Sequence, residues 1–479
     1  MVLFVNFNVL LRIGTPLYLG FLLASGLLAL MPNRAFAGGL EVTSYGARAL
    51  GRGGAVMAAT EGADALRYNP GRLAASRKWT IGLDGQLHIG DTCFTRTDVA
   101  TGTELPEVCN QRGPGYIPQL AASIPIGRKH GLGLGVLFPA GTSALRFGRD
   151  SDGTVAQGGT RIPSPARYSM ISSENLAVFP TIGFGTNYGR LRLGASFGWG
   201  VFVLKNVNFS SGLPSQNELF DARSALSASD SFVPRLMVAG DYDITKRLRL
   251  AFQATWTAAV NASGSVFLSG VTNGMPYSTR IDGATVNSPN PWEAGLGTRY
   301  QGKEWDIEFD FLYLGSSALQ EVVIRLPDSA RLPVAGTIDG KDISRLNSRQ
   351  AIQRHWQDQL IFRVGSEFRI LKSRVALRSG LSYETSGVEH GYEAVDNLPL
   401  SRFGVHAGLG VQMTSYAELN LAFAALFIPE AKVSASEARL EQITGQRPLD
   451  LANERVLINA GSFRTGLQAV ALSVLFRGR

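Results

Sequence analysis

The chain has 479 residues, with 46 Lys and Arg against 38 Asp and Glu and a formal net charge of +8. The basic residues are spread along the chain rather than clustered, so a nucleic-acid-binding surface is excluded. No zinc-ligand spacing, phosphate-binding loop or Gly-x-Ser-x-Gly element occurs, and the sequence therefore predicts no metal, no cofactor and no enzyme.

An apolar segment opens the chain. Arg12 is followed by an apolar run from Ile13 to Met31 and then by Ala35-Phe36-Ala37, a small-x-small cleavage site. The run is also long enough for a membrane anchor. The cleavage site, and the lack of any later apolar run of comparable length, favour a signal peptide at residues 1–37. The rest of the protein is then exported from the cytoplasm.

Residues 38–76 are rich in Gly and Ala, with charges scattered among them. They show neither the two-residue period of a strand nor a sustained helical stripe. A stretch of this length without a period is either disordered or packed inside something larger. Because strand-like segments follow from Arg77 onward, we interpret residues 38–76 as a plug that fills a barrel.

Residues 77–479 contain about fourteen segments of alternating polarity, joined alternately by long loops and short turns. One face of the segments is apolar, as at Phe309 and Phe311, whereas the other is polar or carries glycine, as at Gly194 and Gly198. The pattern predicts an all-β fold, a 14-stranded antiparallel transmembrane β-barrel whose short turns face the periplasm. The inward glycines indicate a plug pressed against the wall, with barrel curvature as the alternative reason.

Two short motifs connect the plug to a known family. Gly51-Arg52, within Ala49-Leu50-Gly51-Arg52-Gly53, is followed by Asn69-Pro70-Gly71, close behind a signal peptide and ahead of a barrel. In this order the motifs resemble the FadL family of outer-membrane transporters for long-chain fatty acids and other hydrophobic compounds. Gly71 stands where that family usually has Ala. The resemblance implies that residues 38–76 are a hatch and that these residues take part in gating.

The resemblance also implies a lateral exit. In the FadL family a kink in the third strand opens the barrel wall towards the membrane. Pro139-Ala140-Gly141 interrupts the third predicted strand at the matching place, which makes Pro139 and Gly141 candidates for the opening. The alternative is that the strand simply ends there at a loop.

Charged residues form columns on the inner faces of neighbouring strands. The predicted acidic column is Glu304, Asp306, Glu308 and Asp310, and the inward residues of the next two strands are Arg363, Glu367, Arg369, Arg374 and Arg378. Unpaired charge is costly in a partly dry lumen, so opposite charges are expected to pair. We favour a structural ladder between wall and plug over a polar wall that orients a carboxylate.

Cys93 and Cys109 lie in one predicted outer loop, and the oxidising periplasm favours a disulfide between them. The sequence predicts a monomeric outer-membrane transporter of a Gram-negative bacterium, in contact with membrane lipid and lipopolysaccharide, that passes fatty acids or other hydrophobic molecules by hatch-gated diffusion. The alternatives are a porin-like channel for polar solutes and, less favoured, an outer-membrane lipid hydrolase.

Overall fold

The structure is a computed structural model that describes residues 44–138, 142–211, 218–272, 275–333, 337–338, 341–342, 344–396, 398–442 and 456–478. The predicted signal peptide, residues 1–37, lies outside the described residues. In the parts of the chain that are described, no helix has the length and apolar character needed to cross a membrane.

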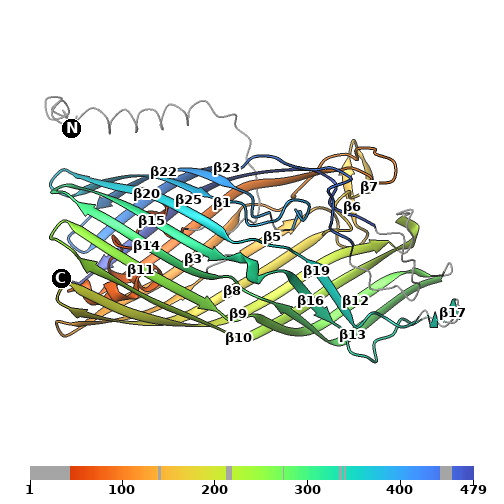
Figure 1. Cartoon of the computed structure of the whole chain (residues 1–479), viewed down its shortest axis with the longest axis horizontal. Helices are drawn as coiled ribbons and strands as arrows, with labels where there is room; N and C mark the ends of the chain where they lie inside the picture. Colours follow the sequence, from red (N-terminus) through yellow and green to blue (C-terminus); the bar gives the residue numbers. More distant parts are fainter. Residues whose placement is uncertain are drawn as a thin grey trace. The chain divides into compact units, whose positions relative to one another are not determined.

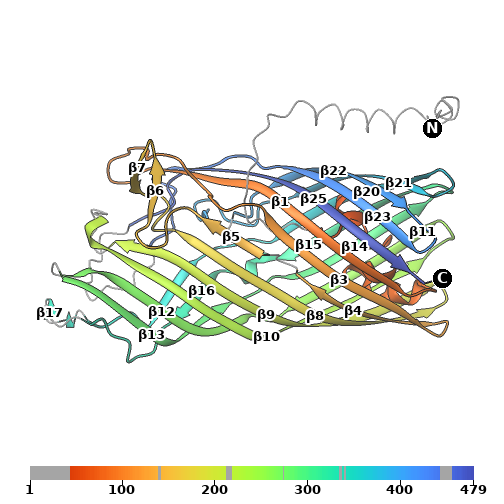
Figure 2. The same ribbon diagram turned by 180° about the vertical axis from the view of Figure 1, so that it is seen from behind.

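The described strands close into an antiparallel ring (Figures 1 and 2). Each place in the ring, which we call a position, is formed either by one strand or by two consecutive strands. The positions formed by one strand are β1 (Thr80–Arg96), β8 (Ser172–Tyr188), β9 (Leu191–Ser211), β10 (Asp221–Asp243), β21 (Val375–Glu384), β22 (Arg402–Gln412) and β25 (Gly461–Arg477). Pairing of β1 with β25, from Thr80 opposite Arg477 to Arg96 opposite Gly461, closes the ring.

The remaining positions each consist of two consecutive strands. They are β2 with β3 (Val108–Cys109, Gly115–Ile126), β4 with β5 (His130–Leu137, Thr142–Arg146), β11 with β12 (Leu248–Thr257, Val260–Thr272), β13 with β14 (Met275–Ser288, Trp292–Gln301), β15 with β16 (Trp305–Gly315, Glu321–Arg325), β19 with β20 (Arg349–Gln353, Gln359–Ile370) and β23 with β24 (Ala417–Phe427, Ala431–Val433). Counted this way the ring has fourteen positions, so the predicted 14-stranded barrel is confirmed.

Small elements complete the description. Before β1 lie α2 (Ala47–Leu50), η2 (Gly62–Asp64), α3 (Ala65–Tyr68) and η3 (Pro70–Ala75), and η4 (Glu218–Phe220) and η5 (Ser316–Ala318) are single turns in the outer part. Two hairpins, β6 (Thr154–Gln157) with β7 (Thr160–Pro163) and β17 (Thr337–Ile338) with β18 (Lys341–Asp342), belong to outer loops. Residues 44–76, which we call the hatch, pack against the inner faces of β4, β8, β9, β22 and β23.

The inside-outside polarity of the wall reverses along its length. In β11 the exposed side chains are apolar, such as Phe252 and Trp256, and the buried ones include Gln253. In β12 the buried side chains are apolar, such as Val260 and Val266, whereas Asn261 is exposed. The first pattern suits a wall in lipid and the second a wall in water. We therefore place β11 in the membrane and β12 beyond it.

The wall extends further into the outer part than alternation alone predicts. Much of residues 269–290 and 325–355 continues the wall as β13 and β19, and the wall position that begins at Trp305 is divided into β15 and β16. Buried side chains of this extension form an apolar cluster that includes Leu226, Leu268 and Ile324.

Candidate functional site

Glycines of the wall form the seat of the hatch. A Cβ placed on Gly194 would lie 2.3 Å from the backbone N of Gly71, and one on Gly185 would lie 2.4 Å from the carbonyl oxygen of Pro70. On the opposite side of the ring, a Cβ on Gly380 would lie 2.2 Å from the carbonyl carbon of Arg52. No side chain fits in these gaps. These contacts agree with the expectation that residues 38–76 are a plug pressed against the inner wall.

Arg52 anchors the first half of the hatch to β14 and β15. Its guanidinium is fully buried and lies 2.7 Å from Asp306 Oδ1, while Arg299 approaches the other oxygen, Oδ2, at 2.7 Å. A second oxygen of the acidic column, Glu308 Oε2, lies 3.6 Å from Arg52. Each charge therefore has an opposite charge beside it, as burial requires.

The acidic column also binds the backbone of the hatch. Asp310 Oδ2 accepts hydrogen bonds from the backbone N–H groups of Val56 (3.0 Å) and Met57 (3.1 Å). Glu308 Oε1 accepts one from Ala58 N at 2.6 Å. Charge-assisted bonds of this kind are strong and directional. The acidic column thus neutralises the charge of Arg52 and holds residues 56–58 of the hatch in place.

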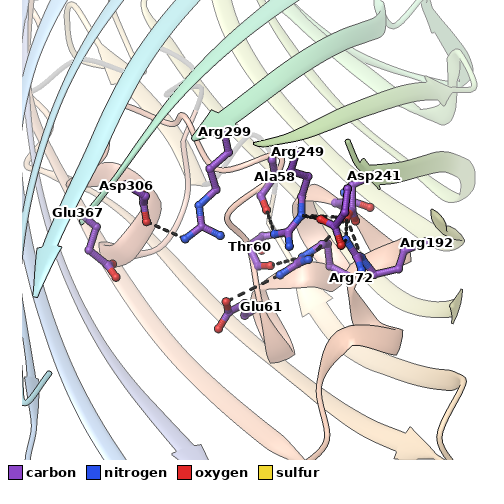
Figure 3. Close-up of polar contacts among 12 residues, drawn as sticks. Ala58, Thr60, Glu61, Arg72, Arg192, Asp241, Arg249, Arg299, Asp306 and Glu367 are labelled. Carbon is purple, nitrogen blue, oxygen red and sulfur yellow. Dashed lines mark hydrogen bonds and ion pairs between the residues drawn. The ribbon is translucent and has the colours of Figure 1, made fainter. Parts of the chain in front are cut away.

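A second anchor holds the other half of the hatch (Figure 3). Arg72 donates to the carbonyl oxygen of Thr60 (2.9 Å) and lies 3.6 Å from the buried Asp241. Arg192 donates to the same carboxylate at 2.7 Å. Arg249 lies 3.3 Å from Asp241 and donates to the carbonyl oxygen of Ala58 at 3.1 Å. The sequence alone did not predict this cluster, because its members come from the hatch, β9, β10 and β11, which are distant from one another in the sequence.

Several predicted members of the charge columns have other roles. Glu304 precedes β15 and Arg374 precedes β21; both are exposed and lie outside the ladder, so their inward assignment was wrong. Arg363 donates to the carbonyl oxygen of Gly54 at 3.4 Å. The buried Glu367 is the centre of a separate group, which consists of Arg369 (2.8 Å), Arg378 (2.7 Å) and the hatch residue Arg48 (3.6 Å).

The Asn69-Pro70-Gly71 turn ties the hatch to itself. Asn69 is fully buried, donates through Nδ2 to the carbonyl oxygen of Met57 (3.0 Å) and accepts from Gly71 N (3.1 Å). Gly71, which stands where the FadL family usually has Ala, lies in η3, and a Cβ built on it would lie 3.1 Å from the carbonyl oxygen of Arg192, a tight contact.

In the described part of the chain, the ladder between the second and third positions of the wall is interrupted, and we call this interruption the break. Pairing of β3 with β4 ends at Leu120 opposite Val136, and β5 pairs with β8 but not with β3 among the described residues. The next backbone link between the two sides is the bond from Gln111 N to the carbonyl oxygen of Arg146. Pro139 and Gly141, the predicted residues of the opening, lie outside the described residues.

An outer cavity of about 290 Å³ lies within the wall extension. Its lining is mostly apolar, with Phe202, Leu226 and Val266 among the side chains, and is supplemented by neutral Ser and Asn residues. Arg354 and Asp396 are its charged residues, and they bind each other in two hydrogen bonds, one of 2.7 Å. A cavity of this size and character suits a small hydrophobic ligand.

An inner pocket of about 60 Å³ lies beside the hatch and reaches the strand break. It is lined by Tyr45, Arg67 and Tyr68 of the hatch and by Gln119 and Leu137, which flank the break. The rest of its lining comes from other wall strands and includes charged residues: Arg235, Met237, Gln253, Glu293 and Arg363.

An apolar cluster separates the two spaces. It consists of Leu137, Ala177 and Phe179, with Phe202 packed against it. The rings of Phe179 and Phe202 meet edge to face at 5.7 Å. Phe202 and Ala177 also line the outer cavity, whereas Leu137 also lines the inner pocket. From the outer end of the wall to the break, the order is therefore the outer cavity, the apolar cluster and the inner pocket.

A disulfide joins Cys93 of β1 to Cys109 of β2. The bond lies beside an apolar cluster of the outer loops, which includes Phe94, Val108 and Phe463. It thereby links the first barrel strand to the segment that leads into the broken part of the wall.

Comparison with known proteins gives a consistent result. Residues 182–462 match the family described as Outer membrane protein transport protein (OMPP1/FadL/TodX). No curated protein matches the sequence. A FadL homologue of Pseudomonas aeruginosa is similar in structure, with a TM-score of 0.69 and 14% identity over 91% of this chain and 99% of that one. The toluene transporter TodX of P. putida gives a TM-score of 0.60 and 16% identity over 92% and 99%. The toluene transporter TbuX of Ralstonia pickettii gives 0.59 and 14% over the same shares.

Proposed function

Because this chain belongs to the OMPP1/FadL/TodX family of Gram-negative outer-membrane transport proteins, we propose that it carries neutral hydrophobic small molecules inward across the outer membrane. The observation that carries the proposal is the outer cavity, which is apolar and whose two charged residues neutralise each other. The protein acts as a monomer and as a passive transporter, not as an enzyme.

The absence of an unpaired cation from the described lining of the outer cavity argues against an ionised carboxylate as the preferred ligand of that cavity. A fatty-acid anion placed there would lose its hydration without gaining a partner, because the Arg354 guanidinium already binds both oxygens of Asp396. A neutral aromatic or aliphatic compound incurs no such cost. The printed name of TodX, a toluene transporter, fits this preference, whereas the FadL homologue leaves it open.

The route we propose follows the order of the features in the wall. A ligand enters the outer cavity, passes Phe179 and Phe202, reaches the inner pocket and leaves through the break between β3 and β4. The hatch, seated on glycine backbone and held by two ion-pair anchors, closes the direct way to the periplasm. Exit into the membrane suits a hydrophobic ligand, which is more soluble there than in water.

Uptake by cells expressing the protein tests the substrate class. We expect labelled toluene to enter faster than in cells with an empty vector, with a smaller gain for labelled oleate and none for a labelled sugar. A gain for oleate that exceeds the gain for toluene would overturn the preference for neutral ligands. Entry of the sugar would instead support a porin-like pore, and hydrolysis of a phospholipid by the purified protein would support the lipid hydrolase.

A matched pair of variants tests the cavity itself. Ala177→Phe fills space at the inner end of the cavity, and we expect toluene uptake to fall roughly tenfold while the barrel stays folded. Ala195→Phe makes the same change on β9 at an exposed position of the lipid-facing side and should leave uptake unchanged. Heat resistance of the folded barrel in gels is the control for folding. Equal uptake by the two variants would remove the cavity from the route.

Hatch variants test the gating step. Asn69→Ala removes the bond to Met57 and leaves the hatch anchors in place, so we expect altered toluene uptake from a folded barrel. Unchanged uptake in Asn69→Ala and in Pro70→Ala would make the turn a structural connector with no part in gating.

A further inference from the structure

The short turns at one end of the barrel carry a ring of positive charge. These turns are residues 127–129, 189–190, 244–247, 302–304, 371–374 and 413–416. Three of them hold two basic residues each: Arg128 and Lys129, Lys246 and Arg247, and Lys372 and Arg374. Arg190 and Lys303 add one each to two others, and Glu304 is the acidic residue among them. We call these basic residues the basic rim.

The basic rim is exposed and forms no ion pair within the described parts of the chain. At the opposite end several basic residues have acidic partners, for example Arg349 with Glu321 and Arg464 with Glu107. In the basic rim, by contrast, no described basic residue has such a partner.

Exposed aromatic residues lie beside the basic rim. Tyr188 is next to the turn that holds Arg190, Tyr242 precedes the turn that holds Lys246, and Trp305 follows Lys303. Tyr188 has 65% of its surface exposed and Trp305 has 43%. Aromatic residues at the ends of barrel strands mark the height of the lipid headgroups. The basic rim thus lies at the headgroup layer or just beyond it.

We propose that the basic rim binds the phosphate groups of anionic phospholipids in the periplasmic leaflet of the outer membrane. Short turns of such barrels face the periplasm, and clustered Lys and Arg beside a membrane attract anionic headgroups. The charged turns follow one another around most of the ring, from β3–β4 to β20–β21. That distribution fits a shell of lipids around the barrel better than the footprint of one acidic protein. The site does not depend on which compound is transported.

Quenching of tryptophan fluorescence by brominated lipids tests the proposal. Trp79 and Trp305 are exposed beside the basic rim, and replacing Trp199, Trp256, Trp292 and Trp356 with Phe leaves them as the reporters. In mixed micelles of the full chain we expect brominated phosphatidylglycerol to bind on the order of tenfold more tightly than brominated phosphatidylcholine. The preference should weaken at high salt, because exposed charges are screened.

Two variants distinguish binding by the basic rim from attraction by the overall positive charge of the protein. One replaces Arg128, Lys129, Lys246, Arg247, Lys372 and Arg374 with Gln and should lose the preference. The control replaces six exposed basic residues of the outer end, Arg149, Arg161, Arg280, Arg325, Arg331 and Lys432, with Gln and should keep it.

Equal binding of the two lipids by the reporter protein overturns the proposal, and this result does not require the Gln variant to fold. Loss of the preference in excess inorganic phosphate, with the ionic strength held constant, would identify a site for free phosphate instead of lipid. Absence of a lipid preference together with crosslinking of position 246 to an acidic periplasmic protein would assign the basic rim to that protein.

Discussion

The inner part of the lumen and its outer extension differ in the side chains that the wall presents to the interior. In the inner part the wall presents charges and bare backbone, and the hatch fills the space with matching charges and with backbone N–H and carbonyl groups. In the outer extension the wall presents apolar side chains to the lumen and leaves a cavity. Buried ion pairs and hydrogen bonds depend on exact geometry, whereas apolar contact does not. The inner part is therefore suited to hold one fixed segment and the outer part to admit ligands that differ in shape.

The largest expected effect comes from breaking the inner anchor. Arg52→Leu leaves Asp306 and Glu308 buried beside each other without their hatch partner, and we expect the free energy of unfolding to fall by about 3–5 kcal/mol. Urea unfolding of the refolded barrel measures the change. Arg161→Leu, at an exposed outer position, is the control and should change stability little.

Charge reversal identifies the partner within that anchor. Asp306→Lys should be rescued in part by Arg299→Glu, because the two side chains lie 2.7 Å apart. Arg363→Glu and Arg369→Glu should not rescue it, since neither arginine contacts Asp306 in the described structure. Rescue by either of the latter would contradict the arrangement of the inner anchor.

The outer part should depend on its covalent link rather than on ion pairs. Reduction or the double change Cys93→Ser and Cys109→Ser should lower stability by roughly 3 kcal/mol, as expected for a bridge across 16 residues. Unreduced protein should take up no thiol label. Labelling of both cysteines before reduction would show that the link is absent in the purified protein.

A smaller effect is expected when the seat of the hatch is filled. Gly194→Ala places a methyl group against the backbone of Gly71, and overpacking of this kind costs about 1–3 kcal/mol. Gly466→Ala is the matched control, because a Cβ there meets no atom within 4 Å. Proteolysis of the hatch should accelerate in the first variant alone. Equal rates in both variants would mean that the hatch does not need this seat.

The smallest effect concerns pH and the outer loops. A hydrogen bond from His390 to Glu393, at 3.1 Å, raises the pKa of the His390 imidazole above its usual value of 6.5. The link is fully formed below pH 6.5 and is lost as the pH rises through the higher value of the folded protein. Protease cleavage of the loop around residue 390 should therefore increase modestly above neutral pH. A His390→Gln variant should show no such dependence.

Much of the architecture was predictable because it follows from local alternation. Residues such as Phe309 and Phe311 face lipid, and glycines such as Gly194 lie where the hatch touches the wall. Alternation shows which face of the wall a side chain lies on, but not where along the barrel axis the strand begins. Glu304 and Arg374 were therefore wrongly assigned to the lumen, whereas Asp306 and Arg378 were assigned to it correctly. The fold class was therefore readable from the sequence, whereas the ends of the charge columns were not.

The outer cavity could not be predicted for a related reason. Its lining comes from strands that leave the membrane, where the apolar side turns from lipid to lumen and the period shifts at Ala258 and Ala259. Residues such as Val266 and Ile281 were available as signals, but they have meaning only once the height of the membrane is known. Likewise, the partners of Asp241 come from hatch, β9 and β11, three distant segments.

The break in the wall has a consequence for self-association. Among the described residues, the ladder between β3 and β4 ends at Leu120 opposite Val136, and strand edges without a partner can recruit strands from other molecules. Pro118 lies in that stretch, paired with Gly85 of β1 on its other side, and Pro114 comes just before it. Proline has no amide hydrogen and is tolerated in a strand where it faces an edge. The two prolines remove two amide donors from this stretch, which makes it a poorer template for strand addition from a second barrel.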